Sequence, residues 1–513
     1  MSTMPLVARR AALPWKAMAH HAKMLSAGAV AGTFAVFLVT GLGMAARKAP
    51  WCDEGWFGSA AYHLAQHGRL AIPEIEPAPD DPKMMRSAEH IFWNVPLYEV
   101  WEGATARLFG FSLFEARVSS LIWGALALAA WSLVVRQVAG GAAALLTLLL
   151  LAVDHILLVK ATDVRMDTMS AALAGTALLL YLHYRQRNLP LAILLSQTCV
   201  TLSFLTHPNG GILAFLDTAL LALYYDRSRL RPRHALAAAA PYVAGALGWG
   251  IYLMQDLALA RVQFGGNAAG RFDGVLAPLT ALRNEILQRY FYAFGGGPDS
   301  KGFARLKLLI LAGYAIGAGG ALTTARRLGG VRVFLILAAV HFCFLAFFDA
   351  TKQGTYLVYI IPLLAILLAV WISAIWKTSP PWARPILAAG VAAFVVLQLG
   401  ATANTILHNR NQRDYLAAAK YLKEHAAPGD LILGPAEMGF EVGFERPISD
   451  DQRLGYYSRK QPKFMVVNEY YRSWFEKFRS ARPAIYAHID SMLESYQPVF
   501  QEGGFEIYER RQP

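Results

Sequence analysis

The chain has 513 residues, of which 56% are hydrophobic and only 16% are charged. Soluble domains carry roughly 25% charged residues, so this composition excludes an ordinary soluble protein, a disordered chain and a disulfide-bonded scaffold. The net charge is +13, from 48 Lys and Arg against 35 Asp and Glu. In a membrane protein such an excess of basic residues first indicates on which side of the bilayer each loop lies.

About eleven segments are long and apolar enough to cross a membrane, which takes roughly 20 residues for a helix. They predict a polytopic α-helical membrane protein. The fifth and sixth segments are separated only by a short turn-forming stretch around Pro208-Asn209. The approximate spans are residues 26–45, 114–135, 138–158, 166–184, 190–206, 209–225, 235–254, 306–325, 332–349, 354–376 and 384–402.

Basic residues are concentrated in the N-terminal tail, residues 1–25, and in the loops between spans that should lie on the same side of the membrane as the tail. The short loops on the other side hold only Lys160, Arg165 and Lys352. This asymmetry predicts a cytoplasmic N-terminus, and an odd number of spans then places the C-terminus outside. We expect a bacterial inner (plasma) membrane protein with a periplasmic or extracellular C-terminal domain. The basic residues of the tail and its side are Arg9, Arg10, Lys16, Lys23, Arg136, Arg185, Arg187, Arg227, Arg229, Arg231, Arg233, Arg326, Arg327, Arg332, Lys377 and Arg384.

Three polar regions share the outer side under this topology. They are the loops 46–113 and 255–305, which interrupt a transmembrane domain of residues 26–402, and the C-terminal region 403–513. We therefore expect chemistry or binding on the outer face. The C-terminal region reads as a small α/β domain, with expected helices at 412–425 and 485–496, strands at 431–433 and 463–467, and a hairpin at 500–509 around Gly503-Gly504.

The first motif that carries chemistry is the pair Asp53-Glu54, directly after the first span. Apolar residues then recur at helical spacing from Trp56 to Ala65, and Gly68 follows them. This pattern predicts an amphipathic helix in the interface plane, with both carboxylates at the height of a lipid head group. An ordinary solvated pair of loop charges would show the same two residues.

Two further motifs place charges at helix ends on the same face. Arg165 and Asp167 begin the fourth span, where a charge is costly unless it is paired or faces water. Lys352 lies in a turn with Tyr356 one helical turn later, and lysine suits a phosphate. The alternatives are an Arg165 pair with Asp163 or Asp167 that only anchors the helix, and a snorkelling lysine beside an interfacial tyrosine.

Carboxylates and cations on one face suit a transferase that acts on a phosphorylated lipid. The departing phosphate needs cations, and the attacking hydroxyl needs a base. The order of these motifs in the chain and their side of the membrane resemble those of the type C (GT-C) glycosyltransferases, in the family 39/83 branch. This branch includes protein O-mannosyltransferases, lipid A aminoarabinose transferases and bacterial lipopolysaccharide galacturonosyltransferases. The resemblance covers about residues 26–370 and rests on Asp53-Glu54, residues 59–68, Val95-Pro96-Leu97-Tyr98, Leu108-Phe109-Gly110, Phe114-Glu115-Ala116-Arg117, Arg165-x-Asp167, Thr206-His207-Pro208 and Lys352…Tyr356…Pro362.

The resemblance implies transfer of a sugar from a polyprenyl-phosphate donor to an acceptor hydroxyl, with inversion and with Asp53 as general base. The acceptor would be a glycolipid, a cell-envelope glycan or a protein. Where relatives often have Lys-Pro-Pro, this chain has Asn94-Val95-Pro96, so Lys83, Arg86 or Lys352 is a candidate to replace that lysine. The implied residues are catalytic Asp53, Glu54 and Asp167; donor-phosphate-binding Arg165, Lys352 and Tyr356; and candidate substrate-binding His90, Asn94, Tyr98 and His207.

The same residues bear on a cofactor and on other functions. Some GT-C enzymes use a divalent cation, so Mg or Mn is a candidate cofactor, although no compact cluster here has metal-ligand spacing. The main alternative function is a polytopic transporter or flippase, which Asp217 inside an apolar run would suit and the lack of internal repeats would not. A non-catalytic scaffold explains neither acidic motif, and nucleic-acid binding does not fit a positive charge that lies largely in the cytoplasmic loops and tail.

Overall fold

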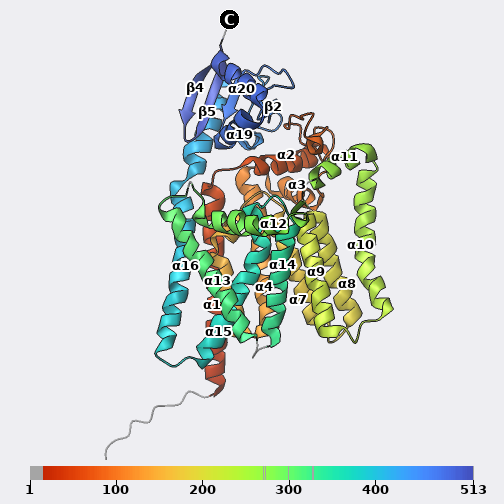
Figure 1. Cartoon of the computed structure of the whole chain (residues 1–513), viewed down its shortest axis with the longest axis vertical. Coiled ribbons are helices and arrows are strands. Elements are labelled where there is room, and N and C mark those ends of the chain that lie inside the picture. Colours follow the sequence, from red (N-terminus) through yellow and green to blue (C-terminus); the bar gives the residue numbers. More distant parts are fainter. Residues whose placement is uncertain (1–14, 270, 272, 299, 326–328, 512–513) are drawn as a thin grey trace, which may run out of the picture.

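The computed structural model of the chain describes residues 15–269, 271, 273–298, 300–325 and 329–511. Long helices form a bundle, and a small α/β domain stands on one end of it (Figure 1). Of the predicted cytoplasmic elements, tail residues 1–14 and the basic residues Arg326 and Arg327 lie outside the described residues.

The bundle confirms the predicted helical membrane protein. Eight helices in the described part of the chain are long and apolar enough to cross a membrane, and a ninth span results if α5 and α6, bent by 65°, are counted as one. Helices α7 and α9 are not among these candidate spans, but they also belong to the bundle. Each predicted segment thus corresponds to one helix of the bundle, except residues 138–158, which form α5 and α6. Its helices are α1 (Trp15–Arg47), α4 (Leu113–Ala139), α5 (Gly141–Val153), α6 (His155–Ala161), α7 (Asp167–Tyr184), α8 (Leu189–Thr206), α9 (Pro208–Asp226), α10 (Pro232–Leu253), α13 (Phe303–Thr324), α14 (Gly329–Phe348), α15 (Leu357–Thr378) and α16 (Ala383–His408).

Helix α7 is buried among other helices of the bundle along most of its length. A Cβ on Gly175 would come within 2.9 Å of the Trp131 ring of α4, so the glycine permits close approach. On the side facing α8, the Ser170 hydroxyl lies 2.7 Å from that of Ser203. Small and hydroxylated residues of this kind pack helices together inside membranes.

The region 46–113 contains two helices that lie across the end of the bundle, α2 (Cys52–His67) and α3 (Leu97–Phe109), and the short turn η1 (Pro82–Met84). Helix α2 is the predicted interfacial helix. It ends at Gly68, whose φ of 67° is in the left-handed region that glycine adopts at low cost. Helix α3 was not predicted.

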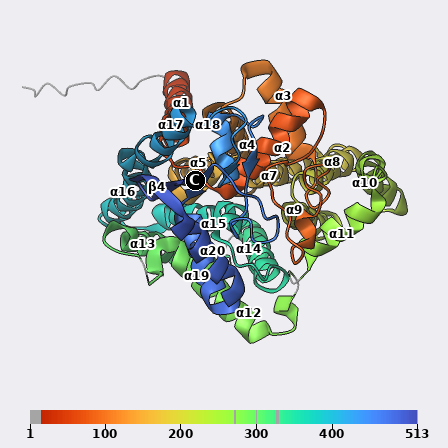
Figure 2. The same ribbon diagram turned by 90° about the horizontal axis from the view of Figure 1, so that it is seen from above.

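The region 255–305, which we expected as a loop, folds into short helices at the same end of the bundle. They are α11 (Leu257–Ala268), η2 (Asp273–Val275), α12 (Pro278–Asn284) and the π-helix η3 (Glu285–Gly296). The 3₁₀ turn η4 (Gly354–Tyr356) follows α14. Seen from above, α11 and α12 lie at the periphery of the bundle (Figure 2).

The C-terminal region contains a five-stranded sheet of order β2-β1-β3-β5-β4, which confirms the predicted α/β class. Strand β1 pairs in parallel with β2 and β3, and β5 pairs antiparallel with β3 and β4. All the expected elements are present, but helix α19 was missed. The elements are η5 (Asn411–Tyr415), α17 (Leu416–His425), β1 (Ile432–Leu433), η6 (Ala436–Met438), α18 (Gly439–Val442), β2 (Ile448–Ser449), β3 (Phe464–Val467), α19 (Glu469–Ala481), α20 (Pro483–Ser495), β4 (Tyr496–Glu502) and β5 (Phe505–Arg510).

The C-terminal domain and the end of the bundle share one apolar core. Phe57 of α2 and Tyr98 of α3 belong to the same buried cluster as Tyr415, Phe464 and Ile507 of the C-terminal domain. Burial of this apolar surface stabilises the contact between the two parts. The domain is therefore built onto α2 and α3 rather than tethered to them by a linker.

Candidate active site

A cavity of about 460 Å³ lies between the end of the bundle and the C-terminal domain. Its wall is formed by the first turn of α2, the loop before α7, the α8–α9 turn, α11, and α19 of the C-terminal domain. Sequence segments that are far apart meet here, and three of the predicted motifs are among them. The cavity volume lies within the range of roughly 300–1,000 Å³ that is usual for small-molecule sites.

Asp53 is the single carboxylate among the described residues that line the cavity. It lies in the first turn of α2, and its side chain is 18% exposed. An Nη of Arg165 forms an ion pair with Asp53 Oδ2. The predicted base therefore faces a ligand-sized space and has a cation as its neighbour.

Arg165 also lines the cavity and joins Asp53 to Asp167. Its Nε donates to Asp167 Oδ2 at 2.7 Å, and its guanidinium lies 5.4 Å from the Trp51 ring centroid and 5.7 Å from that of Phe57. Asp167 is buried behind Arg165 and also accepts from the Tyr359 hydroxyl at 3.4 Å. The predicted Arg165–Asp167 pair is present, and Asp167 positions the arginine rather than facing the cavity.

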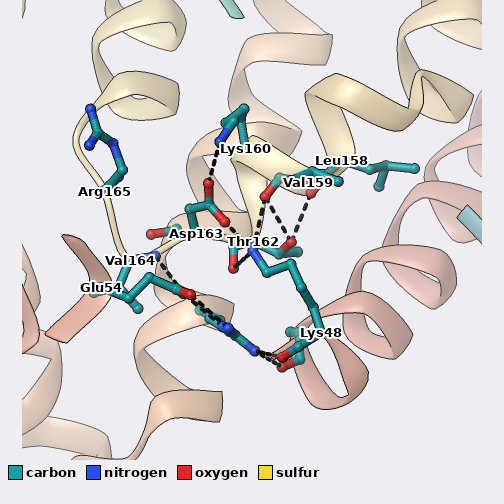
Figure 3. Close-up of polar contacts among 12 residues, drawn as sticks. Lys48, Glu54, Leu158, Val159, Lys160, Thr162, Asp163, Val164 and Arg165 are labelled. Carbon is teal, nitrogen blue, oxygen red and sulfur yellow. Dashed lines mark hydrogen bonds and ion pairs between the residues drawn. The ribbon is translucent and has the colours of Figure 1, made fainter. Parts of the chain in front are cut away.

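Lys48 and Asp163 hold the loop that carries Arg165 (Figure 3). Lys48 Nζ donates to the carbonyl oxygens of Val159, at 3.3 Å, and Thr162, at 3.1 Å, and it forms an ion pair with Asp163. Lys160 Nζ reaches the same carboxylate at 2.8 Å. Burial alone would raise the pKa of Asp163, but the two lysines outweigh it and lower that pKa.

Glu54 does not line the cavity, although it is adjacent to Asp53 in sequence. It is fully buried and accepts two hydrogen bonds from Arg117, at 2.8 and 2.7 Å. Its Oε1 also accepts from the backbone N–H of Val164 at 3.2 Å (Figure 3). In this structure the Glu54 carboxylate positions the residue before Arg165, and the catalytic role that we expected for Glu54 stays a prediction.

Lys352, which we expected at the donor phosphate, lies outside the cavity lining. Its buried Nζ donates to the carbonyl oxygens of Leu345, at 3.0 Å, and Ala346, at 2.5 Å, and lies 3.2 Å from Glu285 Oε2. The two carbonyl oxygens accept hydrogen bonds from the ammonium group, and the Glu285 carboxylate forms an ion pair with it. Lys352 thus joins the turn after α14 to the helical segment η3, and its expected contact with the donor phosphate stays a prediction.

Arg271 lines the cavity in place of Lys352, and we did not anticipate it. Its Nε donates to the Asn267 carbonyl at 2.7 Å, and one Nη lies 3.3 Å from the hydroxyl of Tyr356, which also lines the cavity. Lys83, one of the three candidates to replace the missing lysine, lines it as well, whereas Arg86 pairs with Glu89 and Asp256 outside it.

The four candidate substrate-binding residues divide into two pairs. Asn94 and His207 line the cavity. Tyr98 is fully buried, with its hydroxyl 2.9 Å from that of Ser120, and His90 stacks on Phe92 with ring centroids 5.3 Å apart. The last two lie outside the lining residues, so the structure gives them no contact with a ligand in this cavity.

Four cavity-lining side chains carry polar atoms that are buried and, within the described part of the chain, have no hydrogen-bond partner. They are Trp93 Nε1, His207 Nδ1, Asn209 Nδ2 and Trp474 Nε1. A buried polar atom left unpaired costs free energy, which a ligand atom of the right polarity recovers. Among the described residues, no three His, Cys, Asp or Glu side chains are grouped so as to hold a metal ion, and a role for Mg or Mn stays a prediction.

Comparison with known proteins identifies the fold. The structure of ArnT from Cupriavidus metallidurans bound to undecaprenyl phosphate superposes with a TM-score of 0.62 and 16% identity, over 94% of this chain and 98% of that chain. The chain has the GT-C fold. The GT-C oligosaccharyltransferase of Archaeoglobus fulgidus, in complex with Zn and sulfate, gives a TM-score of 0.55 at 13% identity, over 91% of this chain and 73% of that chain.

At the level of sequence, residues 96–252 match the family model described as dolichyl-phosphate-mannose-protein mannosyltransferase. No curated protein sequence in the comparison matches the chain. The matched segment runs from α3 to α10 and includes the Arg165 loop and His207. The GT-C resemblance expected from the motifs is thus found again in the fold of nearly the whole chain.

Proposed function

We propose that the chain is a glycosyltransferase that moves a sugar from a polyprenyl-phosphate donor to the hydroxyl of a glycolipid, an envelope glycan or a protein. One observation carries the proposal: a single cavity at the end of the bundle holds one carboxylate, Asp53, and three cations, Arg165, Arg271 and Lys83. In GT-C structures of other proteins, ArnT is bound to undecaprenyl phosphate, and the Archaeoglobus enzyme AglB is in complex with dolichol phosphate.

The cations stabilise the leaving group. As the bond from the anomeric carbon to the phosphate oxygen breaks, that oxygen keeps the electron pair, and negative charge grows on the phosphate. Arg165 and Arg271 carry permanent charges at the cavity wall, where the low dielectric strengthens their effect. Tyr356 accepts a hydrogen bond from Arg271 and so orients this cation.

Asp53 takes the proton of the acceptor hydroxyl as its oxygen attacks the anomeric carbon from the face opposite the phosphate, which inverts the configuration. Before the donor binds, Arg165 bridges Asp53 and Asp167. A donor phosphate competes for the Nη groups, while Nε keeps its bond to Asp167. Binding of the donor then releases Asp53 for the acceptor and places the cation on the phosphate.

The site lies on the outer face of a bacterial inner membrane in this proposal, with the N-terminus in the cytoplasm. The connection between α15 and α16 lies at the end of the bundle away from the C-terminal domain (Figure 1), and it is flanked by Lys377 in the last turn of α15 and Arg384 in the first turn of α16. Basic residues favour the cytoplasmic side. The cavity and the C-terminal domain are therefore extracytoplasmic, where a lipid-linked sugar meets envelope acceptors.

The residue that would suit a transporter has a structural explanation. Asp217 is fully buried within the bundle, and both its oxygens lie within 3.0 Å of His341 Nε2. The other ring nitrogen of His341 lies 3.1 Å from the Tyr359 carbonyl oxygen. This pair links α9, α14 and α15 and contributes no group to the cavity, so we do not propose transport.

The proposed function is tested with polyprenyl-phosphate sugars that carry label in the sugar. They are added to membranes with and without the chain, and labelled products are separated from the intact donor. We expect label in a new, chain-dependent product, whose identity names the acceptor. Label that remains entirely in donor lipid, across a panel of hexose, pentose and aminopentose donors, would overturn the proposal.

A further inference from the structure

The C-terminal domain contributes part of the cavity wall. Tyr470 and Trp474, both on α19, are the two residues of this domain among the described residues that line the cavity. They lie one helical turn apart, with ring centroids separated by 6.4 Å and planes at 83°. The rest of the lining comes from the membrane domain and its outer segments.

The sequence of α19 explains why these two rings face the cavity. Tyr471, Phe475 and Phe478 recur at helical spacing and are buried in the core of the C-terminal domain. Tyr470 and Trp474 occupy the adjacent stripe of the helix and are only half-buried. Lys477 Nζ lies 4.2 Å from the Trp474 ring centroid, so one face of the indole is covered by a cation of the same helix.

Asp450 fixes the position of α19 relative to Asp53. One of its oxygens accepts from the Tyr471 hydroxyl at 2.7 Å, and the other accepts from Trp56 Nε1 of α2 at 2.8 Å. The carboxylate thus ties α19 to the helix that carries the proposed base. Burial raises the pKa of Asp450, and the two donors partly offset that rise.

Close backbone packing also holds the C-terminal domain against α2. A Cβ on Gly55 would lie 2.2 Å from the backbone nitrogen of Glu437, so nothing larger than glycine fits at that contact. Gly58 packs in the same way on the ring of Phe440. The contacts between α2 and the C-terminal domain therefore hold Tyr470 and Trp474 in the wall of the cavity that Asp53 also lines.

We propose that Tyr470 and Trp474 form a sugar-binding subsite in the cavity that Asp53 lines: the Trp474 ring stacks on the apolar face of a sugar ring, and the Tyr470 ring, whose plane stands at 83° to the indole, borders the edge of that sugar. Aromatic rings carry a negative face that attracts the polarised C–H groups of a sugar. The unpaired Trp93 Nε1, His207 Nδ1 and Asn209 Nδ2 in the same cavity suit the hydroxyl groups at a sugar's edge. This inference rests on the proposed function, and it assigns the C-terminal domain a part in substrate selection.

The sugar comes from one of two sources, the donor or a glycan acceptor, and two assays separate them. The full chain is reconstituted in nanodiscs, and native mass spectrometry gives its affinity for decaprenyl phosphate alone and for decaprenyl phosphate that carries mannose or arabinose. In membranes, labelled donor reports how turnover divides between transfer to acceptor and hydrolysis by water. The variants are W474A, W474L, W474F, Y470A and Y470F, with Y457A as the control for removal of an exposed ring of the same domain.

For a stacked donor sugar we expect W474A and W474L to weaken binding of the sugar-bearing lipid about three- to tenfold, with bare decaprenyl phosphate unchanged. W474F and Y470F keep a ring and retain most of the affinity. For a stacked acceptor sugar, donor binding is unchanged, but transfer falls relative to hydrolysis. W474L keeps bulk in the wall, so it tests the aromatic face even if W474A unfolds the domain.

The inference is overturned if W474L and Y470A behave like Y457A in both assays. It is also overturned if bare and sugar-bearing lipids lose affinity equally, because the variants then act on the phosphate or on the fold. A wild-type chain that binds none of the lipid phosphates contradicts the proposed function itself, and this result is distinct from an intact wild type with silent α19 variants.

Discussion

The two carboxylates in the first turn of α2 are adjacent in sequence but lie in different environments. Asp53 lines a cavity and is paired with Arg165, which also lines the cavity. Glu54 is enclosed by Arg117 and the Val164 N–H. Successive residues of a helix point about 100° apart, so one face of α2 presents a carboxylate to the cavity and the next face buries a carboxylate in an ion pair. Chemical type alone therefore does not assign a catalytic role; the face of the helix decides it.

The largest effect should come from Asp53→Asn. The amide keeps the size of the side chain but accepts no proton, and loss of a positioned general base typically lowers the rate about 10²–10⁴-fold. We expect a turnover number reduced by that factor, with the amount of chain in the membrane and its melting temperature close to wild type. Turnover within a factor of about three of wild type would remove Asp53 from the mechanism.

Glu54→Ala should have its main effect on stability, whereas Asp53→Asn has its main effect on turnover. Removal of one partner of a buried ion pair leaves an uncompensated charge, here on Arg117, and costs about 3–5 kcal/mol of stability. Thermal unfolding in detergent measures this loss, and Glu424→Ala, at an exposed Lys420–Glu424 pair, is the control. Equal stability of the Glu54 and Glu424 variants would contradict the anchor role.

The two cations Arg271 and Lys352 extend the comparison to the donor phosphate. Arg271→Gln removes a charge-assisted hydrogen bond at the cavity wall, which is worth about 1.5–3 kcal/mol, so donor affinity should fall roughly ten- to hundredfold. Lys352→Met should lower the melting temperature and leave the donor affinity of the folded protein unchanged. Binding of a labelled lipid phosphate checks both, and a selective loss of affinity in the Lys352 variant would restore that residue to the phosphate site.

Glu437 provides a second contrast with Glu54, because it is buried and has no ion pair with a cation among the described residues. Burial, aided by nearby Asp450, raises its pKa to about 8. The folded state then keeps a proton that the unfolded chain loses above its ordinary pKa of 4.5. Between pH 4.5 and 8 this group should lower stability by about 1.4 kcal/mol per pH unit as the pH rises.

Glu437→Gln removes this contribution and keeps an oxygen for the Asn468 amide, which lies 3.2 Å from Glu437 Oε1. We expect the melting temperature of wild type to fall relative to that of the Glu437→Gln variant as the pH increases from 5 to 8. Parallel curves of melting temperature against pH would show that Glu437 is ionised in the folded protein.

Much of the architecture followed from the sequence because hydrophobic length and period are local signals. The membrane helices, α2 with its stop at Gly68, and the Arg165–Asp167 pair required only neighbouring residues. The start of α2 at Cys52 was not evident from neighbouring residues. Without that start, the sequence does not tell that Asp53 and Glu54 point in different directions.

Other parts of the site depend on contacts between distant segments. Lys352 forms an ion pair with Glu285, and Arg271 donates a hydrogen bond to Tyr356. The partners in each pair are far apart in sequence, so no local sequence pattern predicts these contacts. Helix α19 did carry a signal, since Tyr471, Phe475 and Phe478 have helical spacing. Its role in the cavity, however, follows only from its attachment to α2 through Asp450.

The central claim is tested most directly by a donor-loaded, single-turnover measurement on wild type and the Asp53→Asn variant. Each is loaded with sugar-labelled polyprenyl phosphate, and acceptor-containing membranes are then added. We predict equal loading of the two proteins, rapid transfer by wild type, and label that stays in intact donor on the variant. Transfer by the variant at the wild-type rate would contradict the claim that Asp53 is the base of a lipid-phosphate-dependent glycosyltransferase.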